Sequence, residues 1–500
     1  MRPSDSRLTD SPFHDHFELA ALIQPRSRAA AHLRTSSDAG RRLRELARRV
    51  RRFAVAALFA AVPVGGSMAG LLAGSLVGGS SALYVVAPAS AAAPEANWPT
   101  FRGSDRSAVS NEKGLLQAWP AEGPKLVWEA KGAGRGYASL AVAGGKLFTL
   151  GDGTPANGGD NKTEFLSAFA LDSGKQLWQT ETGSPWNSGA PTWQGSRSTP
   201  TVDGDRVYVI TPYGKLFCCD AASGQVKWSK DLKEEFGGKK GDGWGYSESV
   251  LVDGDNAVFT PGGDKNTMVA VNKLTGEVVW KTIREGDRGA GHASIVVSEI
   301  GGTRVYVTTT ASGAMGVRAT DGKLLWSYEI DRTTAVIPTP IVRGDLVFFA
   351  AGYKRGGALL KQVAQPENLV NVEEVYPIKP ALANKHGGIV LVGDHLFGDS
   401  DDAGVPFCAS LMTGEIVWKE RGSGRGSAAF AAADGCIYVR FQNGVIALAK
   451  ATPDGYKETG SFKIPGEETM PSWSHPVITG GRLFLREQDR ILCYDVTAPQ

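Results

Sequence analysis

Short runs of alternating apolar and polar residues recur from residue 124 to residue 496. Many of them flank a turn that contains Gly or Asp, as in TVDGDRVYVI, LVDGDNAVFT, VLVGDHLFG and VITGGRLFLR. A period of two places every second side chain on the same face of a strand, and a turn with Gly or Asp is typical of a β-hairpin. The pattern therefore predicts antiparallel strands along this whole segment.

A longer period joins these hairpins into units. Trp128, Trp178, Trp228 and Trp280 are 50, 50 and 52 residues apart, Trp326 follows after 46, and Trp418 after a further 92. In five units a small residue, a glycine and the tryptophan stand at positions one, seven and eleven: Ala168, Gly174, Trp178; Cys218, Gly224, Trp228; Ala270, Gly276, Trp280; Gly316, Gly322, Trp326; and Cys408, Gly414, Trp418. We expect the glycine to supply a positive φ in a turn, and the small residue to leave room for an indole from the neighbouring unit. All six tryptophans are thus predicted to be structural docking residues.

A period of 40 to 50 residues with four strands per unit predicts an all-β, eight-bladed β-propeller. The inner strands are expected to begin near Tyr137, Arg197, Tyr246, His292, Ile337, His386, Arg425 and His475. Tyr376 and Phe462 stand where two further tryptophans are due. The last unit lacks an outer strand, whereas the strand at 126–130 lacks a hairpin of its own. We therefore expect this N-terminal strand to pair with residues 492–496 and close the ring.

The first 93 residues differ from the rest of the chain. Residues 1–52 contain twelve Arg against six Asp or Glu, and residues 53–93 contain no charged side chain. A basic flank, an apolar stretch and the small residues 89–93 are typical of a secretory signal, and the apolar stretch is also long enough for a retained anchor. We expect a basic segment (1–52), a signal peptide or membrane anchor (53–93), an N-terminal extension (94–123) and the propeller (124–496).

This organisation predicts export to the periplasm or cell envelope, with residues 53–87 in the inner membrane if the anchor is retained. Membrane contact is expected through the N-terminal segment alone, and the protein is expected to be a monomer. Residues after 52 carry a net charge of −4, which excludes a nucleic-acid binder on grounds of charge.

The docking repeat resembles that of the PQQ-like, or quinoprotein-type, propellers. The opening NWPTFRGSDRSAVS, with Trp98, Phe101 and Arg102, is also similar to the start of exported bacterial members. The resemblance covers residues 124–496, and the family divides into at least two functional classes. Some members are dehydrogenases that hold pyrroloquinoline quinone and calcium on the propeller axis, and others are non-enzymatic, BamB-like assembly factors. The repeat is structural, so the fold does not choose between them.

The adjacent residues Cys218 and Cys219 are the first candidates for chemistry, because quinoprotein alcohol dehydrogenases use a vicinal disulfide beside the quinone. Cys218, however, occupies the small-residue position of the docking motif. Neighbouring residues on a strand also point to opposite faces, which disfavours joining them. We interpret both as core residues. The five cysteines show neither a disulfide framework nor a metal-ligand spacing.

The second candidate site is the mouth of the central channel. Three histidines stand at predicted starts of inner strands, and further polar residues stand at or near such starts: His292, His386 and His475, with Glu248, Arg197, Tyr137 and Tyr246. Inner strands surround the axis, so these side chains should converge where propellers usually bind ligands. The alternative is a polar lining of a water-filled channel. The histidines belong to units four, six and eight, which are too far apart for one zinc ion, so no metal site is predicted.

These observations predict an exported, non-enzymatic propeller without a cofactor, which binds a protein or polymer at a face of the disc. The resemblance to BamB-like factors implies a role in cell-envelope assembly, although no cysteine precedes Cys218 for the lipid attachment of those factors. The alternative is a PQQ-dependent alcohol or sugar dehydrogenase with bound calcium. Units of about 47 residues leave little room for the lid and walls of a quinone site, and no catalytic residue is assigned.

Overall fold

The structure is a computed structural model that describes residues 96–154, 162–466 and 470–499. These residues belong to one compact unit, Ala89–Gln500. The predictions for residues 1–52 and 53–93 concern residues outside the described ones. In the described part of the chain, no helix combines the length and the apolar character needed to cross a membrane.

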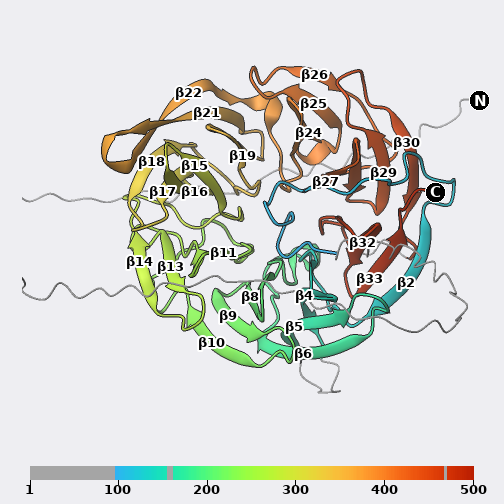
Figure 1. The fold of residues 1–500 in the computed structure, drawn as a ribbon, viewed down its shortest axis with the longest axis horizontal. Coiled ribbons are helices and arrows are strands. Elements are labelled where there is room, and N and C mark those ends of the chain that lie inside the picture. The colour runs from blue at the N-terminus through green and yellow to red at the C-terminus, as the bar shows by residue number, and fades with distance from the viewer. Residues whose placement is uncertain (1–95, 155–161, 467–469, 500) are drawn as a thin grey trace, which may run out of the picture. The chain divides into compact units, whose positions relative to one another are not determined.

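Eight sheets follow one another around a ring, which confirms the predicted eight-bladed β-propeller (Figure 1). Their strands pair antiparallel, except that β1 pairs parallel with β27. The first four blades are formed by β3 (Ala141–Ala143), β4 (Lys146–Gly153), β5 (Thr163–Ala170) and β6 (Gln176–Gly183); β7 (Thr201–Asp203), β8 (Arg206–Ile210), β9 (Lys215–Asp220) and β10 (Val226–Asp231); β11 (Leu251–Asp253), β12 (Asn256–Phe259), β13 (Met268–Asn272) and β14 (Val278–Thr282); and β15 (Val296–Ile300), β16 (Thr303–Thr310), β17 (Gly313–Arg318) and β18 (Leu324–Glu329).

The other four blades include the two that use N-terminal strands. They are formed by β19 (Ile341–Arg343), β20 (Leu346–Ala351), β21 (Gly356–Gln365) and β22 (Leu369–Lys379); β23 (Val390–Val392), β24 (His395–Asp399), β25 (Pro406–Ser410) and β26 (Ile416–Lys419); β27 (Ala428–Ala433), β28 (Cys436–Phe441), β29 (Val445–Lys450) and β30 (Glu458–Lys463), with β1 (Val109–Ser110); and β31 (Val477–Thr479), β32 (Arg482–Glu487) and β33 (Arg490–Asp495), with β2 (Lys125–Lys131). Short 3-10 helices lie between strands: η2 (Pro191–Trp193), η3 (Pro366–Asn368), η4 (Pro380–Leu382) and η5 (Asp401–Ala403).

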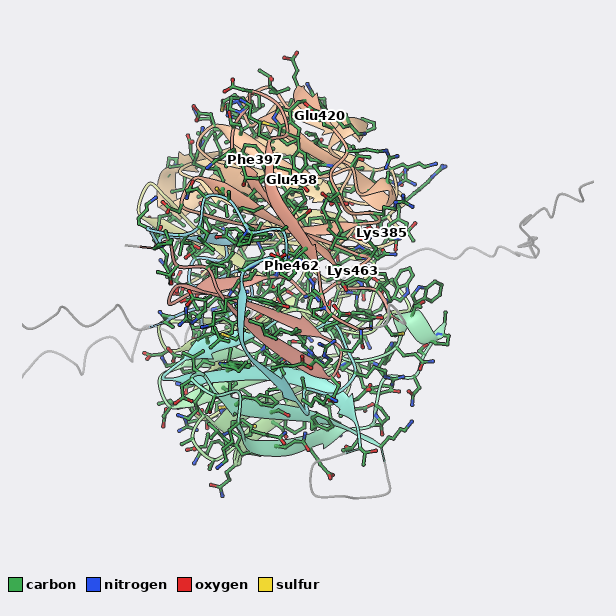
Figure 2. The ribbon with its side chains drawn as sticks, turned by 90° about the vertical axis from the view of Figure 1, so that its right-hand side faces the viewer. Lys385, Phe397, Glu420, Glu458, Phe462 and Lys463 are labelled. Atoms are coloured by element: carbon green, nitrogen blue, oxygen red, sulfur yellow. The ribbon has the colours of Figure 1, made fainter. Side chains whose placement is uncertain are left out.

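The ring closes between the N-terminal and C-terminal strands, as the sequence predicts. Strand β2 pairs antiparallel with β33, so that Trp128 lies opposite Cys493 and Glu129 opposite Leu492. The N-terminal strand thereby completes the eighth blade and covers the edge that β33 would otherwise expose. Figure 2 shows the rim of the ring from the side of β30, on which Phe462 and Lys463 are labelled.

Each docking tryptophan lies between its own blade and the next. The indole nitrogens of four of them donate to backbone carbonyls in the turns of the following blade: Trp178 to Ala221 at 3.3 Å, Trp228 to Lys273 at 3.1 Å, Trp280 to Ala319 at 3.0 Å and Trp418 to Thr452 at 2.9 Å. Trp280, Trp326 and Trp418 are buried, whereas Trp128, Trp178 and Trp228 are half-buried. Tyr376 and Phe462 take the same place in the blades without a docking tryptophan.

The residue that receives the neighbouring indole differs from the prediction. The small residue of the motif lies directly opposite the tryptophan of its own blade, as in Ala168 with Trp178 and Ala270 with Trp280. The glycine instead lies against the indole of the preceding blade, since a Cβ at Gly224 would be 2.5 Å from Cε3 of Trp178. Gly224 also has a φ of +76°. The glycine is therefore required both by its turn and by the indole that covers it.

The centre of the ring is crossed by the N-terminal extension, shown in blue in Figure 1. Trp98 exchanges backbone hydrogen bonds with Val142 of the first blade, and β1 pairs with β27 of the seventh. The buried Arg106 guanidinium donates to the carbonyls of Ser249 and Ile295 at 2.8 and 3.1 Å, on the third and fourth blades. Arg102 donates to the carbonyls of Gly387 and Ile389 at 3.0 and 2.6 Å, on the sixth. This segment ties the blades together across the axis.

Candidate functional site

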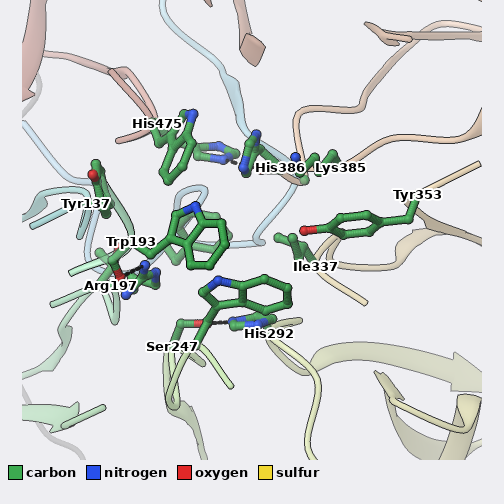
Figure 3. A pocket seen from close by; sticks show the side chains of 15 residues that line it. Tyr137, Trp193, Arg197, Ser247, His292, Ile337, Tyr353, Lys385, His386 and His475 are labelled. Atoms are coloured by element: carbon green, nitrogen blue, oxygen red, sulfur yellow. Dashed lines mark hydrogen bonds between the residues drawn. The ribbon is translucent and has the colours of Figure 1, made fainter. Parts of the chain in front are cut away.

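One pocket at the ring axis collects most of the predicted mouth residues. Five of the seven candidates line it: Tyr137, Arg197, His292, His386 and His475. Tyr137, Arg197 and His292 each stand four positions before the first strand of their blade, which begins at Ala141, Thr201 and Val296. The short extended segment before each inner strand thus brings its side chain to the axis (Figure 3).

The other two candidates, Tyr246 and Glu248, point away from the pocket. The Tyr246 hydroxyl donates to the Pro261 carbonyl at 2.8 Å inside the core. The Glu248 carboxyl accepts from the backbone and hydroxyl of Thr260 at 2.8 and 3.1 Å, and burial raises its pKa to about 7. Ser247, between them, lines the pocket instead, because consecutive side chains of an extended segment alternate in direction. It stands four positions before Leu251, so the spacing seen in the other blades identifies it.

The pocket has a volume of about 350 Å³ and walls rich in aromatic rings. Trp244 stacks on Tyr353 with ring centroids 6.3 Å apart and meets the edge of Trp193 at 5.8 Å. Trp473 lies 4.8 Å from Tyr137 between ring centroids. Trp193, Trp244, Trp473 and Tyr353 were not predicted from the sequence to line this pocket. The three tryptophans break the docking period, so the repeat does not account for them, but Trp98, Trp119 and Trp186 break it too and are buried outside the pocket.

The pocket ends blindly rather than opening into a channel. Phe101 of the N-terminal extension lines it and contacts the edge of the His475 ring, with centroids 4.8 Å apart. The two residues that anchor the extension, Arg102 and Arg106, are 2% and 4% exposed. A ligand at this mouth would therefore rest on the chain's own N-terminal segment.

His386 and His475 lie side by side on one wall of the pocket (Figure 3). Nε2 of His475 lies 3.1 Å from the carbonyl oxygen of His386, so it carries the proton and donates. Nδ1 of His475 then has a free lone pair, and neither this atom nor Nδ1 of His386 has a hydrogen-bond partner. Burial lowers the pKa of both histidines to about 3, so both rings are neutral at physiological pH.

His292 lies on the opposite wall in a different network. Its Nε2 lies 2.9 Å from the Asp242 carboxylate, and its Nδ1 lies 2.6 Å from Oγ of Ser247. The carboxylate fixes the proton on Nε2, and Nδ1 accepts from the serine hydroxyl. Lys240 Nζ lies 2.9 Å from Asp242 and 3.2 Å from Nε2 of His292.

This Ser, His and Asp arrangement lacks the electrostatics of a hydrolase triad. In such a triad the carboxylate stabilises the imidazolium that forms when the serine loses its proton. Here the Lys240 ammonium shares that carboxylate and also lies against the imidazole. Burial and the Lys240 charge lower the pKa of His292, so that protonation of the ring is disfavoured. We interpret the network as holding the segment that carries Trp244 at the mouth.

Two cations face the pocket, and none of its fifteen lining residues is acidic. The Arg197 guanidinium lies 5.4 Å from the centre of the Tyr137 ring, and Lys385 Nζ lies 4.9 Å from that of Tyr353. Burial lowers the pKa of Arg197 to about 10, which leaves it charged at neutral pH. The pocket is thus an aromatic cavity with positive charge on its walls.

The two adjacent cysteines lie away from this pocket, between blades. Cys218 packs among residues of the second and third blades, and Cys219 packs toward the first. Their side chains therefore point to opposite faces of one sheet. All five cysteines are buried and unbonded.

The pocket residues do not fit the calcium ion of a quinoprotein dehydrogenase. Calcium takes six to eight oxygen ligands, most of them carboxylate, carbonyl or amide oxygens. The lining provides imidazole, indole, phenol and cationic groups and the hydroxyls of Thr199 and Ser247, and it contains no Asp, Glu, Asn or Gln side chain. Within residues 96–154, 162–466 and 470–499, no three His, Cys, Asp or Glu residues are grouped so as to hold a metal ion.

Comparison with known sequences gives one family. The family model described as outer membrane protein assembly factor BamB matches residues 161–420, just over half of the chain. The BamB of Shewanella oneidensis is 26% identical over 244 residues, which are 45% of this chain and 57% of that protein. The BamB of Xanthomonas campestris is 31% identical over 134 residues, 27% of this chain and 31% of that protein. The chain therefore spans a little more than half the length of the first of these curated relatives and about a third of the second.

Comparison with solved structures gives the same fold in proteins of different function. BamB from Moraxella catarrhalis superimposes with a TM-score of 0.51 and 14% identity, covering 74% of this chain and 99% of that one. The quinohemoprotein alcohol dehydrogenase from Comamonas testosteroni gives a TM-score of 0.54 and 11% identity, covering 81% of each chain. A europium-containing methanol dehydrogenase gives 0.54 and 12%, covering 79% and 89%. At such identities these similarities show the fold alone.

Proposed function

Because the chain belongs to the family of outer membrane protein assembly factor BamB, we propose that it is an exported binding scaffold of the cell envelope. Its partner is a protein or a polymer that contacts the propeller at the mouth of the axial pocket. The relatives in this family are named for outer membrane protein assembly. For this chain, the basic and apolar segments at 1–52 and 53–93 support the envelope location.

The observation that carries the proposal is the blind, aromatic and positively charged pocket. Trp193 at its rim is 43% exposed, although tryptophan is usually buried where it serves the fold alone. Exposed aromatic residues and arginine are the residue types enriched in binding sites. The same pocket lacks the carboxylate and amide side chains that usually supply the oxygen ligands of calcium. Binding therefore accounts for the lining better than redox catalysis does.

The dehydrogenase alternative is tested by thermal unfolding with pyrroloquinoline quinone and calcium. A ligand that binds the folded state alone, at a hundredfold excess over Kd, stabilises it by about 2.7 kcal/mol. We expect no rise in melting temperature, no quinone absorbance after dialysis and no dye reduction with alcohols or sugars. A rise that a His292→Ala variant abolishes would assign the pocket to the cofactor and contradict the scaffold.

Partner binding is tested by placing a photo-crosslinking amino acid at position 193 in the cells that make the protein. The matched control is position 274, where Leu274 is 52% exposed in the turn after β13, away from the pocket. We expect a crosslinked adduct of higher mass from position 193 and none from position 274. No adduct at position 193, or equal adducts at both, would contradict binding at this mouth.

A further inference from the structure

The walls of the axial pocket are formed mainly by aromatic rings. Six of its fifteen lining residues carry a phenyl, phenol or indole ring: Phe101, Tyr137, Trp193, Trp244, Tyr353 and Trp473. Tyr353 points into the pocket from the side opposite Tyr137 (Figure 3). Aromatic rings pack favourably against the faces and edges of other rings, and such pairs add to the gain from burying apolar area. The lining therefore favours a ligand group that is flat and apolar.

The polar groups around these rings already have partners or are out of reach of a ligand. The Tyr137 hydroxyl donates to a backbone carbonyl at 2.6 Å, and the Ser247 hydroxyl donates to Nδ1 of His292 at 2.6 Å. Nδ1 of His386 and of His475 is unpaired but fully buried, so a ligand in the pocket does not contact it. The hydroxyl groups of a sugar would lose their hydrogen bonds to water here and gain few in return. The pocket therefore favours an apolar ring over a sugar.

Arg197 makes an electron-rich ring the better ligand. Its guanidinium donates to the carbonyl of Gly195 at 2.9 Å and to that of Trp193, and it lies over the Tyr137 ring. These partners carry no formal charge, so they do not neutralise the positive charge at the pocket wall. A cation is attracted to the face of an aromatic ring, and most strongly to that of indole. An indole is therefore favoured over an aliphatic group of similar size.

One residue of the wall is held in a strained turn. Tyr353 and Lys354 lie between β20 and β21 with φ values of +56° and +63°. Glycine or asparagine suits such a conformation better than a residue with a large side chain. The Asp401 carboxylate fixes the turn, because it accepts from the backbone N–H groups of Tyr353 and Lys354 at 2.9 Å each. The turn stacks the Tyr353 ring on Trp244, and backbone strain at the wall of a pocket indicates a role in binding.

The dimensions of the pocket fit one side chain, and the neighbouring groove fits the chain that carries it. The pocket has a volume of about 350 Å³, whereas a cavity of roughly 150 Å³ is enough to bind benzene. The pocket therefore accommodates a two-ring indole. A groove of about 630 Å³ shares Trp193 and Trp473 with the pocket, and Gln442 and Asn443 line it. Amide side chains both donate and accept, so they can pair with the backbone of a protein segment.

We propose that the axial pocket receives a tryptophan side chain of the partner protein, and that the residues on either side of this tryptophan lie in the neighbouring groove. This inference rests on the proposed binding function and specifies the partner as a protein with an exposed tryptophan. The indole packs among the aromatic rings of the lining, and the flanking backbone pairs with the amide groups of the groove.

The experiment titrates the full-length protein with a capped pentapeptide that has tryptophan in the middle and serine at the other positions. The same peptide with cyclohexylalanine keeps the size but loses the aromatic ring, free indole loses the flanking backbone, and cellotriose is the sugar probe. We expect a Kd of about 1 mM or lower for the tryptophan peptide, since the pocket buries one indole. The cyclohexylalanine peptide and indole should bind at least about threefold more weakly, and cellotriose should not bind.

Variants locate the binding in the pocket. Tyr353→Asn removes a ring of the wall and suits the positive φ of the turn, and Ile337→Trp fills the pocket with an indole of the chain itself. Tyr213→Asn is the matched control, because Tyr213 is 41% exposed in the corresponding turn of the second blade, between β8 and β9, outside both cavities. We expect about tenfold weaker binding for each pocket variant and an unchanged Kd for Tyr213→Asn. The melting temperature of Tyr353→Asn should stay close to that of the parent.

The outcomes separate this inference from the proposed function. No binding of the tryptophan peptide at about 5 mM, equal binding of the cyclohexylalanine peptide, or an unchanged Kd in either pocket variant would each overturn the tryptophan assignment. Equal binding of indole would overturn it in favour of a free aromatic ligand, and tighter binding of cellotriose in favour of a polysaccharide. In each of these cases a crosslinked adduct from position 193 would still support the scaffold, whereas loss of that adduct contradicts the scaffold itself.

Discussion

At the scale of single residues, the period of the repeat identifies the docking tryptophans but not the tryptophans that line the pocket. Indoles spaced 46 to 52 residues apart, or 92 in the case of Trp418, pack between blades. Of the six other indoles, Trp193, Trp244 and Trp473 line the pocket, whereas Trp98, Trp119 and Trp186 are buried elsewhere. Spacing along the chain identifies the docking set because six of the eight blades repeat it. Spacing does not show which residue meets the indole, because that contact lies between blades. The assignment of the indole's neighbour to the small residue rather than to Gly224 was wrong for this reason.

The two roles predict opposite effects of the same substitution. Trp280→Ala should destabilise the protein by about 3 to 5 kcal/mol, because it removes a buried ring and opens a cavity between two blades. Trp193→Ala should leave the melting temperature nearly unchanged, since this ring is 43% exposed at the rim, and should weaken partner binding. Thermal unfolding of the two variants side by side checks both. Equal melting temperatures would show that the docking role is misassigned.

At the scale of elements, the alternation of apolar and polar residues predicted the strands. The features that this alternation could not predict lie in the segments between strands. Tyr137, Arg197 and His292 lie on irregular segments four residues before an inner strand, whereas His475 stands two residues before its strand. A one-residue offset therefore exchanged Tyr246 for Ser247. The N-terminal extension has no hydrophobic period. Its role across the axis depends on Arg102 and Arg106 meeting carbonyls of distant blades. Such long-range hydrogen bonds leave no trace in local sequence patterns.

The extension should contribute stability through these arginines. Arg106→Met keeps the length of the side chain but removes the donors to the Ser249, Val250 and Ile295 carbonyls. We expect a loss of about 2 to 4 kcal/mol, because these buried acceptors lose their charged partner, together with faster proteolysis within residues 96–110. Arg332→Met is the control, since its side chain is 84% exposed. Identical unfolding and proteolysis of the two variants would mean that the extension does not hold the ring together.

At the scale of the whole molecule, the repeat predicted the ring but not its contents. The last of the eight units lacks one strand, and the N-terminal strand lacks a hairpin partner, so pairing the two leaves no edge of the ring exposed. The pairing of β2 with β33 confirms this closure. The same symmetry also leads to the expectation of an open channel at the axis, where the chain instead places its own N-terminal segment. A repeat specifies how blades pack on one another. The blind pocket combines residues at equivalent positions of the repeat, such as Tyr137 and His292, with residues outside it, such as Trp193 and Phe101, and both groups carry the candidate function.

Closure of the ring can be tested by a disulfide across the junction of its ends. Lys131 and Arg490 lie opposite each other on β2 and β33, and replacing both by cysteine would join the two ends of the propeller. Lys215 and Asp231 occupy the matching place on β9 and β10, so their double cysteine variant closes only one hairpin. Because a longer loop loses more entropy in the unfolded chain, we expect oxidation to stabilise the first variant by up to roughly 5 kcal/mol and the second by about 3.

The measurement for this prediction is the difference in melting temperature between the oxidised and reduced forms of each variant. Arg490 also pairs with Glu129, at 2.7 Å, but the substitution removes that ion pair from both redox forms, so the difference isolates the crosslink. The five native cysteines are buried and unbonded in the structure, so we expect them not to pair with the introduced ones. A smaller rise for the variant at the junction than for the hairpin variant, or failure of its two cysteines to join, would show that the ends of the chain do not meet in β2 and β33. A larger rise would show that closing this junction constrains the whole ring.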